Sequence, residues 1–350
     1  MKILIGEISS YKAIVIARHL RLHYPNVEIW TYDYKPLVGL IHTRYADHYV
    51  RLSFVSSENY IRQIADYAKQ INADVLIPVH SDYIGKILQN KHLFGHTLDY
   101  LGEYADYIQL HEKDRLMHWA RELKIRVPDE YADVVSAKLP FVVKPTNMSS
   151  AKGVRYCFTE KQRVSIQGLS KNMLCQEYIE GRGCGYEVYC NKGQILVEYG
   201  HIRLAEWPVS GGSSVLRAPY LHPEMRPIAQ RILQQIQWSG FAMFEFKLTK
   251  DNHLVLIEVN PRIWGSINQA LQDGCPFFDC IVGDGQTDYH SSGIRTCLSP
   301  QVHLSLVAYT MHGQWDRVID YWKHRRQTYS DVNICTDPCG WLSMVIRKIV

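Results

Sequence analysis

Alternating side chains mark two consecutive strands in the last third of the chain, over residues 241–248 and 254–260. Each run is rich in β-branched or aromatic residues, and each carries one glutamate. A polar segment with Asp251 and Asn252 separates the runs, and these residues favour a tight turn. The pattern therefore predicts a β-hairpin with a two-residue loop.

The expected register of this hairpin places two glutamates face to face. With a two-residue loop, counting along both strands puts Glu245 opposite Glu258, and Asn260 lies on the Glu258 face. Directly opposed residues have Cβ atoms roughly 4.5–5.5 Å apart, where two like charges destabilise the sheet. Two carboxylates and an amide oxygen suit Mg²⁺ or Mn²⁺ bound together with phosphate and water. We therefore predict that Glu245, Glu258 and Asn260 bind a divalent metal ion.

A solvent-exposed hairpin with two unrelated surface glutamates is the alternative interpretation. Met243 on the Glu245 face, and Leu254 and Leu256 on the predicted Glu258 face, favour the metal site. Carboxylates that are crowded among apolar side chains need a shared proton or a cation. Arg262 follows the second strand and can hold a carboxylate or phosphate bidentately.

Short apolar strands alternate with helices in the N-terminal part of the chain. Strands are expected at 2–5, 27–33 and 75–79, and helices with one apolar stripe at 13–20 and 60–71. This alternation is typical of an α/β fold with a parallel sheet whose faces are covered by helices. In such sheets, ligands bind outside the carboxyl ends of the strands.

Polar residues follow two of these strands. Ser9 and Ser10 come after the first strand, and Ser81 and Asp82 come after the strand at 75–79. They can touch a substrate or cap the helices that follow, and both interpretations stay open. The first of these segments has one glycine where a dinucleotide-binding fingerprint has three, so a Rossmann-type cofactor site is not expected.

Two lysines occupy positions that suit an anionic ligand. Lys113 lies in the first turn of a predicted helix over 112–123, where the helix dipole disfavours a positive charge, although an exposed lysine is the alternative. Lys144 ends the predicted strand 141–144. The loop at 146–153 follows, and its small and hydroxylated residues can wrap phosphate oxygens with their N–H groups. An ordinary hairpin loop is the alternative for this segment.

Further basic and polar residues follow later in the chain. His201 and Arg203 alternate onto one face of a strand, and the serine and glycine residues at 210–214 predict a loop that accommodates phosphate or carboxylate. The apolar and basic segment 340–350 is predicted to be a docked terminal helix, with membrane-surface or partner binding as alternatives.

The composition is that of an ordinary globular protein, with 350 residues of which 46% are hydrophobic and 21% charged. A net charge of +4 without a dominant basic cluster argues against nucleic-acid binding. The nine cysteines contain no CxxC pair, so reduced thiols in a cytoplasmic protein are expected rather than a zinc site. No signal-peptide pattern and no apolar stretch of about 18 residues, as a membrane span needs, is found.

Together these motifs resemble the ATP-grasp superfamily, which includes biotin carboxylase, the large subunit of carbamoyl-phosphate synthetase and D-alanine–D-alanine ligase. The resemblance covers residues 110–285. It rests on Lys113, on VVKP with Lys144, on QEYIEG at 176–181, and on FEF followed by EVNPR at 258–262.

The resemblance implies a fold and a division of the chain. A parallel α/β domain at 1–110 would precede the ATP-grasp fold. A small lobe at 111–184 would carry the phosphate loop and the adenine segment. A large lobe at 185–350 would carry the metal site and the C-terminal helices, and both lobes would be built on antiparallel sheets.

The resemblance also implies roles for individual residues. The nucleotide would be held by Lys113, Lys144, Lys152, Gln176, Glu177, Tyr178 and Ile179. Gly183 stands where relatives have an acidic ribose contact, so Glu180 and Glu187 are the candidates for that role. The metal ligands would be Glu245, Glu258 and Asn260. The catalytic residues would be Lys144, Arg203 and Arg262, and the substrate contacts would be His201, Arg203, Ser213 and Arg262.

The implied function is that of an ATP- and Mg²⁺-dependent ligase. Such an enzyme activates a carboxylate as an acyl-phosphate, joins it to an amine or a thiol, and releases ADP and phosphate. Two alternatives are a phosphotransferase that acts on a small hydroxylated substrate and a nucleotide-binding regulatory protein without turnover. Basic residues that biotin carboxylase places around bicarbonate are not found, so carboxylation is not expected. The expected partners are small-molecule substrates and, as in related proteins, a second copy in a homodimer.

Overall fold

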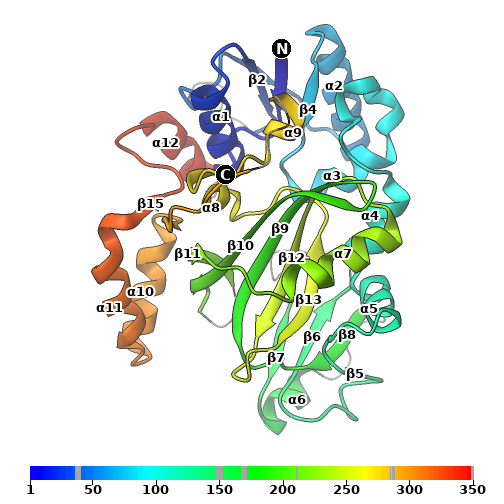
Figure 1. Ribbon diagram of the computed structural model, residues 1–350, viewed down its shortest axis with the longest axis vertical. Helices are drawn as coiled ribbons and strands as arrows, with labels where there is room; N and C mark the ends of the chain where they lie inside the picture. Colours follow the sequence, from blue (N-terminus) through cyan, green and yellow to red (C-terminus); the bar gives the residue numbers. More distant parts are fainter. Residues whose placement is uncertain are drawn as a thin grey trace.

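Three β-sheets succeed one another along the long axis of the molecule (Figure 1). They are seen in a computed structural model that describes residues 1–35, 41–146, 153–166, 172–209, 212–283, 285 and 288–347. The N-terminal sheet lies at one end, the largest sheet lies in the middle, and a small sheet lies at the other end.

The N-terminal sheet is parallel, with the strand order β3-β2-β1-β4. Its strands are β1 (Lys2–Ile5), β2 (Glu28–Asp33), β3 (His48–Arg51) and β4 (Val75–Ile77). Its helices are α1 (Tyr11–His23), α2 (Ser57–Gln70), α3 (Ser81–Gln89) and the 3-10 helix η1 (Lys91–Leu98). Parallel strands need such crossover helices, which cover the apolar faces of the sheet. The carboxyl ends of β1 and β4 bring the starts of α1 and α3 to one edge, which faces the middle of the molecule (Figure 1).

The small sheet is antiparallel, with the order β5-β8-β6-β7. Its strands are β5 (Glu130–Tyr131), β6 (Phe141–Pro145), β7 (Arg155–Cys157) and β8 (Met173–Glu177). Helix α6 (Glu160–Ile166) packs on β7, whereas α4 (Tyr104–His111) and α5 (Lys113–Glu122) contact β13 of the largest sheet. A small core around Phe141 and Val143 holds this sheet together.

The largest sheet has the order β13-β12-β9-β10-β11-β14-β15. Its strands are β9 (Arg182–Asn191), β10 (Gln194–Trp207), β11 (Ser213–Pro219), β12 (Gly240–Leu248), β13 (Leu254–Asn260), β14 (Arg295–Cys297) and β15 (Thr328–Ser330). All neighbouring pairs are antiparallel except β14 with β15. Phe244 and Phe246 share a core with helix α7 (Met225–Ile236), and Phe241 packs against the fully buried Trp264 on the other face.

The remaining helices follow the hairpin of β12 and β13 in the chain. They are α8 (Ile267–Gln272), α9 (Asp279–Val282), α10 (Gln301–Met311), α11 (Trp315–His324), the 3-10 helix η2 (Arg325–Gln327) and α12 (Pro338–Ile346). Helix α12 packs against α1, so the expectation of a docked C-terminal helix is confirmed (Figure 1). Asp337 caps this helix by accepting a hydrogen bond from the Gly340 amide at 3.0 Å, and it also accepts one from the Thr43 hydroxyl.

The hairpin of β12 and β13 confirms the opposed pair Glu245 and Glu258, but the predicted loop length was wrong. Thr249 donates its backbone N–H to the His253 carbonyl at 2.9 Å, so three residues, 250–252, form the loop. The extra loop residue shifts the register by one, and a bulge at Ile257 shifts it back. The two differences cancel at the glutamates.

The same bulge changes which side chains of β13 lie on the same face of the sheet. Leu254 and Leu256 lie in the core with Phe244 and Phe246, on the face opposite to Glu258. The prediction that they share the Glu258 face was therefore wrong, because the bulge inverts the alternation between Leu256 and Glu258.

The observed architecture confirms the predicted fold class, with a parallel N-terminal sheet followed by two mostly antiparallel sheets. The boundaries at 110 and 184 stay predictions. The segment expected as a loop at 210–214 contains the start of β11 at Ser213. None of the helices that the structure describes has both the length and the apolar character that a membrane crossing requires.

Candidate active site

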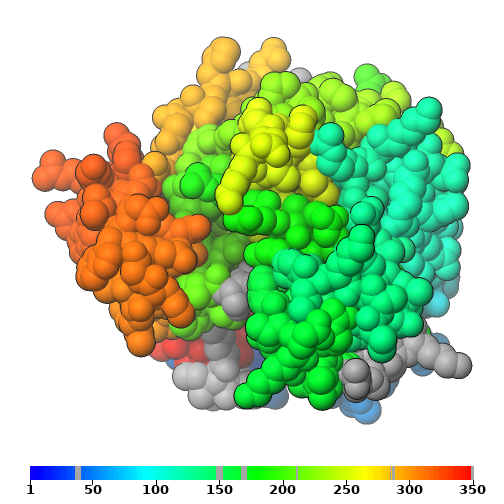
Figure 2. Space-filling model, turned by 90° about the horizontal axis from the view of Figure 1, so that it is seen from below, coloured from blue at the N-terminus to red at the C-terminus, as the bar shows by residue number. Residues whose placement is uncertain are grey.

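A cavity of about 1020 Å³ lies where the three sheets meet. Its walls come from the carboxyl edge of the N-terminal sheet, from β6 and β8 of the small sheet, and from β12 and β13 of the largest sheet. Helices α10 and α11 stand across from the small sheet when the molecule is seen from below (Figure 2). Most of the predicted site residues line this cavity, namely Lys113, Lys144, Gln176, Glu177, Tyr178, Ile179, Arg203, Ser213, Glu245, Glu258, Asn260 and Arg262.

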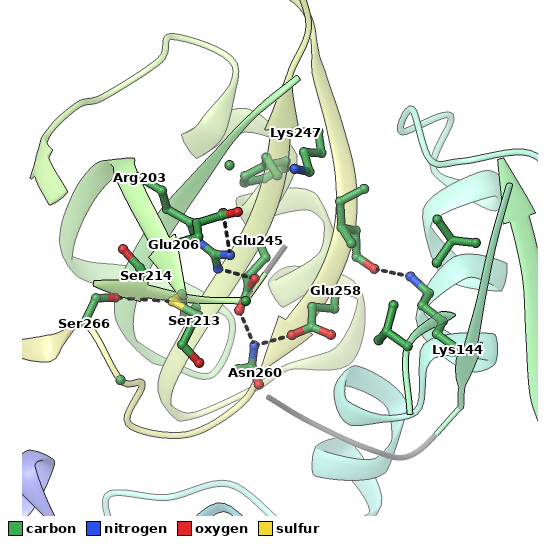
Figure 3. Close-up of a pocket in the computed structure, with 18 of the residues that line it drawn as sticks. Lys144, Arg203, Glu206, Ser213, Ser214, Glu245, Lys247, Glu258, Asn260 and Ser266 are labelled. Carbon is green, nitrogen blue, oxygen red and sulfur yellow. Dashed lines mark hydrogen bonds and ion pairs between the residues drawn. The ribbon is translucent and has the colours of Figure 1, made fainter. Parts of the chain in front are cut away.

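Glu245 and Glu258 face each other on β12 and β13, and Asn260 lies between their carboxylates (Figure 3). The Asn260 amide nitrogen donates to Glu245 Oε1 at 3.1 Å and to Glu258 Oε1 at 3.0 Å. Alternation along the strand brings Asn260 to the Glu258 face, so the sequence pattern itself places these three side chains together.

Basic side chains surround the two carboxylates. Arg203 on β10 binds Glu245 with one guanidinium nitrogen, and the other nitrogen lies 3.4 Å from Glu206 (Figure 3). Lys113, the first residue of α5, lies 3.3 Å from the Glu258 carboxylate. Each acidic residue of the opposed pair therefore has its own cation, one from the largest sheet and one from the helix next to the small sheet.

Burial and neighbouring charges shift the pKa values of the two carboxyl groups in opposite directions. Burial and the Glu258 charge raise the pKa of Glu245 against the opposing effect of Arg203. Although burial also acts on Glu258, Lys113 and Lys144 hold the pKa of this carboxyl well below its usual range. Glu258 is thus anionic at neutral pH, and a divalent cation between the two groups would favour the ionised form of both.

Lys144 lies at the end of β6 and is buried. Its ammonium group donates to the Ile257 carbonyl at 3.3 Å, at the bulge of β13 (Figure 3). Burial lowers the pKa of Lys144 to about 8 against the opposing charge of Glu258. A strand residue with few free rotamers holds this charge in place, as a phosphate contact requires.

Arg262 follows β13 and is 8% exposed. It donates to Asn260 Oδ1 at 2.7 Å and to the Ile263 carbonyl at 3.1 Å. Its Nε atom is buried and has no hydrogen-bond partner within the described part of the chain. Because a buried N–H group without a partner costs free energy, this atom is suited to a ligand that accepts a hydrogen bond.

The residues 176–179 form the wall at the end of β8. Gln176 donates to Glu130 at 3.0 Å across the small sheet, and Glu177 accepts from the Asp129 amide at 3.4 Å. The Tyr178 and Ile179 backbone follows the end of the strand. The segment lines the cavity together with the aromatic residues Tyr156 and Phe158, which suits a flat aromatic base.

The comparisons with known proteins agree with this geometry. Residues 110–266 match the family model of the ATP-grasp domain. The chain contains an ATP-grasp domain. This finding confirms the resemblance to the ATP-grasp superfamily that the sequence motifs indicate. No curated protein matches the chain by sequence.

Solved structures show the same fold over most of the chain. The biotin carboxylase domain of Hydrogenobacter thermophilus 2-oxoglutarate carboxylase, in complex with MgADP and bicarbonate, is 16% identical with a TM-score of 0.63 and covers 83% of this chain and 71% of that chain. L-amino acid ligase from Bacillus licheniformis is 16% identical with a TM-score of 0.59 and covers 81% and 73%. N5-carboxyaminoimidazole ribonucleotide synthetase from Thermotoga maritima is 17% identical with a TM-score of 0.59 and covers 84% and 79%.

Two predicted site residues of the ATP-grasp domain lie elsewhere. Glu187 and His201 are buried in the middle of the largest sheet, where they bind each other, and neither lines the cavity. The structure therefore does not bring these two side chains to the cavity with the other predicted site residues. The reason is Gly185 between them, because a Cβ atom there would lie 2.4 Å from His201 Cε1. Without a side chain at 185, the imidazole folds down onto the sheet toward Glu187.

Lys152 and part of the loop at 210–214 lie outside the described residues, so their predicted roles stay predictions. Ser213 and its neighbour Ser214 line the cavity (Figure 3). Ser9, Ser10, Ser81 and Asp82 also line it, at the starts of α1 and α3, and the Ser10 side chain makes no capping hydrogen bond. The same residues thus lie at a helix start and on the wall of the cavity.

Sequence reasoning missed several cavity residues, namely Lys12, Glu206, Lys247 and Arg347. Lys12 carries the signal that identified Lys113, since it lies in the first turn of a helix. Arg347 carries no local signal, because only the packing of α12 against α1 brings it to the cavity.

Proposed function

We propose that the protein is an ATP- and Mg²⁺-dependent ligase that activates a carboxylate as an acyl-phosphate and joins it to an amine. ADP and phosphate would be the other products. The observation that carries this proposal is the opposed pair Glu245 and Glu258, with Asn260 between them, in a cavity that also contains Lys113 and Lys144. The ligase names of the structural neighbours support the same reaction class.

The donor set fits a magnesium ion that also binds phosphate. Among the described residues, no three His, Cys, Asp or Glu side chains gather at one point, so a site made only of such ligands is not found there. Mg²⁺ in nucleotide sites takes one or two carboxylates and keeps positions for phosphate and water. Glu245 and Glu258 would hold it, and Asn260 would join them through Oδ1 once its side-chain amide turns away from the present contact with Arg262. The ion would neutralise charge on the transferred phosphoryl group.

The basic residues have complementary tasks. Lys113 and Lys144 approach from the side of the small sheet and would hold the phosphate groups of ATP. The segment 176–179 would hold the adenine. Arg262 would hold the substrate carboxylate, since its buried Nε has no partner and its guanidinium also contacts Asn260.

The chemistry then needs no nucleophilic side chain. A carboxylate oxygen of the substrate attacks the γ-phosphate, and the acyl-phosphate is opened by the amine. The protein's contribution is to place two anions close together and to compensate their charge. Lys144, Arg203 and Arg262 provide that compensation from three segments around the cavity.

The test is turnover of ATP with panels of carboxylic acids and amines, including amino acids, in Mg²⁺ buffer. We expect release of ADP and phosphate that requires a carboxylate, and an acyl hydroxamate when hydroxylamine replaces the amine. A phosphorylated product that resists hydroxylamine would indicate phosphotransfer to a hydroxyl group. AMP formation, or nucleotide binding without turnover under any condition, would contradict the proposal. Thiols belong in the acceptor panel as well, and the homodimer stays a prediction.

A further inference from the structure

The end of the cavity nearest the N-terminal sheet is built from two helix starts. Helix α1 begins after Ser10 and helix α3 begins at Ser81, and both serines line the cavity. The first turn of α1 contains no acidic residue, although this is the turn where a negative charge would be favourable. Instead it contains Lys12, whose charge the helix dipole disfavours.

Lys12 is 7% exposed and lines this end of the cavity. Its ammonium group donates to the Val79 carbonyl. No carboxylate in the described part of the chain lies within ion-pair distance of it. Burial and the nearby charges of Arg262 and Arg347 lower the pKa of Lys12. Burial beside two guanidinium groups and a helix start favours the neutral amine of Lys12, and an anion bound next to it would restore the charged form.

Arg262 also lacks a carboxylate partner among the described residues. Although it is 8% exposed, no carboxylate of a described residue lies within ion-pair distance of it. Its partners are the neutral Asn260 and the Ile263 carbonyl, and its buried Nε has no hydrogen-bond partner within the described residues. Arg262 therefore connects the metal-site hairpin with the Lys12 end of the cavity.

Arg347 adds a third cation from the far end of the chain. It donates to the Ser9 hydroxyl at 2.8 Å and lies 3.6 Å from Asp33. Asp33 also accepts hydrogen bonds from the Ser9 amide and hydroxyl, so this carboxylate accounts for the position of Arg347. Part of the positive charge at this end of the cavity therefore serves to neutralise Asp33.

The acidic residues behind the cavity do not compensate the remaining cations. Glu7 is buried, contacts the Tyr60 hydroxyl at 3.4 Å, and is not within ion-pair distance of Lys12. Burial raises the pKa of Glu7 to about 7, so this group is only partly charged at neutral pH. Asp82, which lines the cavity too, is exposed to solvent. Lys12 and Arg262 are thus buried at the cavity without a carboxylate partner among the described residues.

We propose that Lys12 and Arg347, with the starts of α1 and α3, bind a second anionic group of the carboxylate substrate. This inference rests on the proposed function, in which Arg262 holds the carboxylate that reacts. The substrate would then carry a further carboxylate or a phosphate at the end away from the reacting group. Both kinds of group accept several charge-assisted hydrogen bonds, which the side chains of Lys12 and Arg347 would donate.

The experiment compares acids that carry a second anionic group, called dianions below for their two anionic groups, with counterparts that carry only one. Binding to the full-length protein is measured by calorimetry with Mg²⁺ and a non-hydrolysable ATP analogue present. Succinate is compared with succinamate, and 3-phosphoglycerate with glycerate. We expect at least one dianion to bind about 10–100-fold more tightly than its partner, because one charge-assisted hydrogen bond contributes that much. The two pairs show whether the second group is a carboxylate or a phosphate.

Three variants locate the effect. Lys12→Gln and Arg347→Gln should each reduce the preference for the dianion at least tenfold, while ATP-analogue binding stays unchanged. Lys86→Gln removes the same charge from the exposed end of α3 and should keep the preference. Arg347 is only partly buried, so its variant decides the question even where Lys12→Gln does not fold.

The outcomes separate this subsite from the proposed reaction. Equal affinity for each dianion and its singly charged partner, or a preference that survives Lys12→Gln and Arg347→Gln, overturns the subsite. ADP release with singly charged acids as fast as with dianions also overturns it and leaves the ligase function standing. A dianion preference that both variants abolish, without ADP release for any acceptor, supports the subsite and contradicts the ligase function.

Discussion

The Lys113 ammonium group lies 3.3 Å from the Glu258 carboxylate, so an ion pair joins the first residue of α5 to strand β13. Both side chains are largely buried. The pair keeps Glu258 ionised at neutral pH. It also connects the small sheet side of the cavity with the largest sheet, where a triphosphate would lie.

Glu258→Gln tests the metal site directly. The substitution keeps the shape of the side chain but removes one of the two opposed charges. We expect turnover to fall on the order of 100-fold or more, because the metal ion and the phosphates lose an electrostatic partner. ADP release at saturating Mg²⁺ measures the effect. Glu122→Gln is the matched control, since Glu122 is an exposed residue of α5 that does not line the cavity. Full activity of Glu258→Gln would show that the metal binds elsewhere.

Lys144 should limit activity at alkaline pH. Burial lowers its pKa to about 8, so the cation that would hold the phosphates is present below this pH and lost above it. We expect kcat/KM for ATP to decline as the pH rises through about 8, since this ratio reports the free enzyme. In Lys144→Arg this decline should disappear, because a guanidinium stays protonated. An unchanged alkaline decline in the variant would assign it to another group.

Arg203 should compensate Glu245 when no metal is bound. In Arg203→Gln the two opposed carboxylates lose one of their cations. We expect the melting temperature in EDTA to fall by roughly 5 °C, because a largely buried ion pair is broken. Millimolar Mg²⁺ should raise it more in the variant than in the wild type, since the metal replaces the missing charge. Arg182→Gln, an exposed change on β9, should respond to Mg²⁺ as the wild type does. An equal Mg²⁺ response of Arg203→Gln and wild type would contradict this role.

Glu7 should make stability depend on pH. Burial, and then the Asp33 charge, raise its pKa from 4.5 to about 7 in the folded protein. The folded state then holds a proton that the unfolded state has released, so stability falls as the pH rises from about 4.5 to about 7. Glu7→Gln removes this loss. We expect the variant to gain on the order of 3 kcal/mol relative to the wild type between pH 4.5 and pH 8. Urea unfolding at both pH values measures it, with the exposed Glu122→Gln as control. A difference that does not grow with pH would show that Glu7 is ionised in the folded state.

Local patterns in the sequence determined the elements and much of the site. The apolar periods predicted the parallel N-terminal sheet and the hairpin strands, because side-chain direction repeats every two residues in a strand and every 3.6 in a helix. The misplaced charge of Lys113 and the opposed pair Glu245 and Glu258 were also local observations. The register came out correctly only because the longer loop and the bulge at Ile257 cancel.

The tertiary structure alone decided which segments share the cavity. His201 alternates onto the same strand face as Arg203, yet Gly185 beneath it lets the imidazole lie on the sheet beside Glu187. Arg347 meets Ser9 because α12 packs on α1, and no periodicity encodes that contact. Periodicity determines the face of an element on which a side chain lies, whereas the neighbour it meets depends on how distant elements pack.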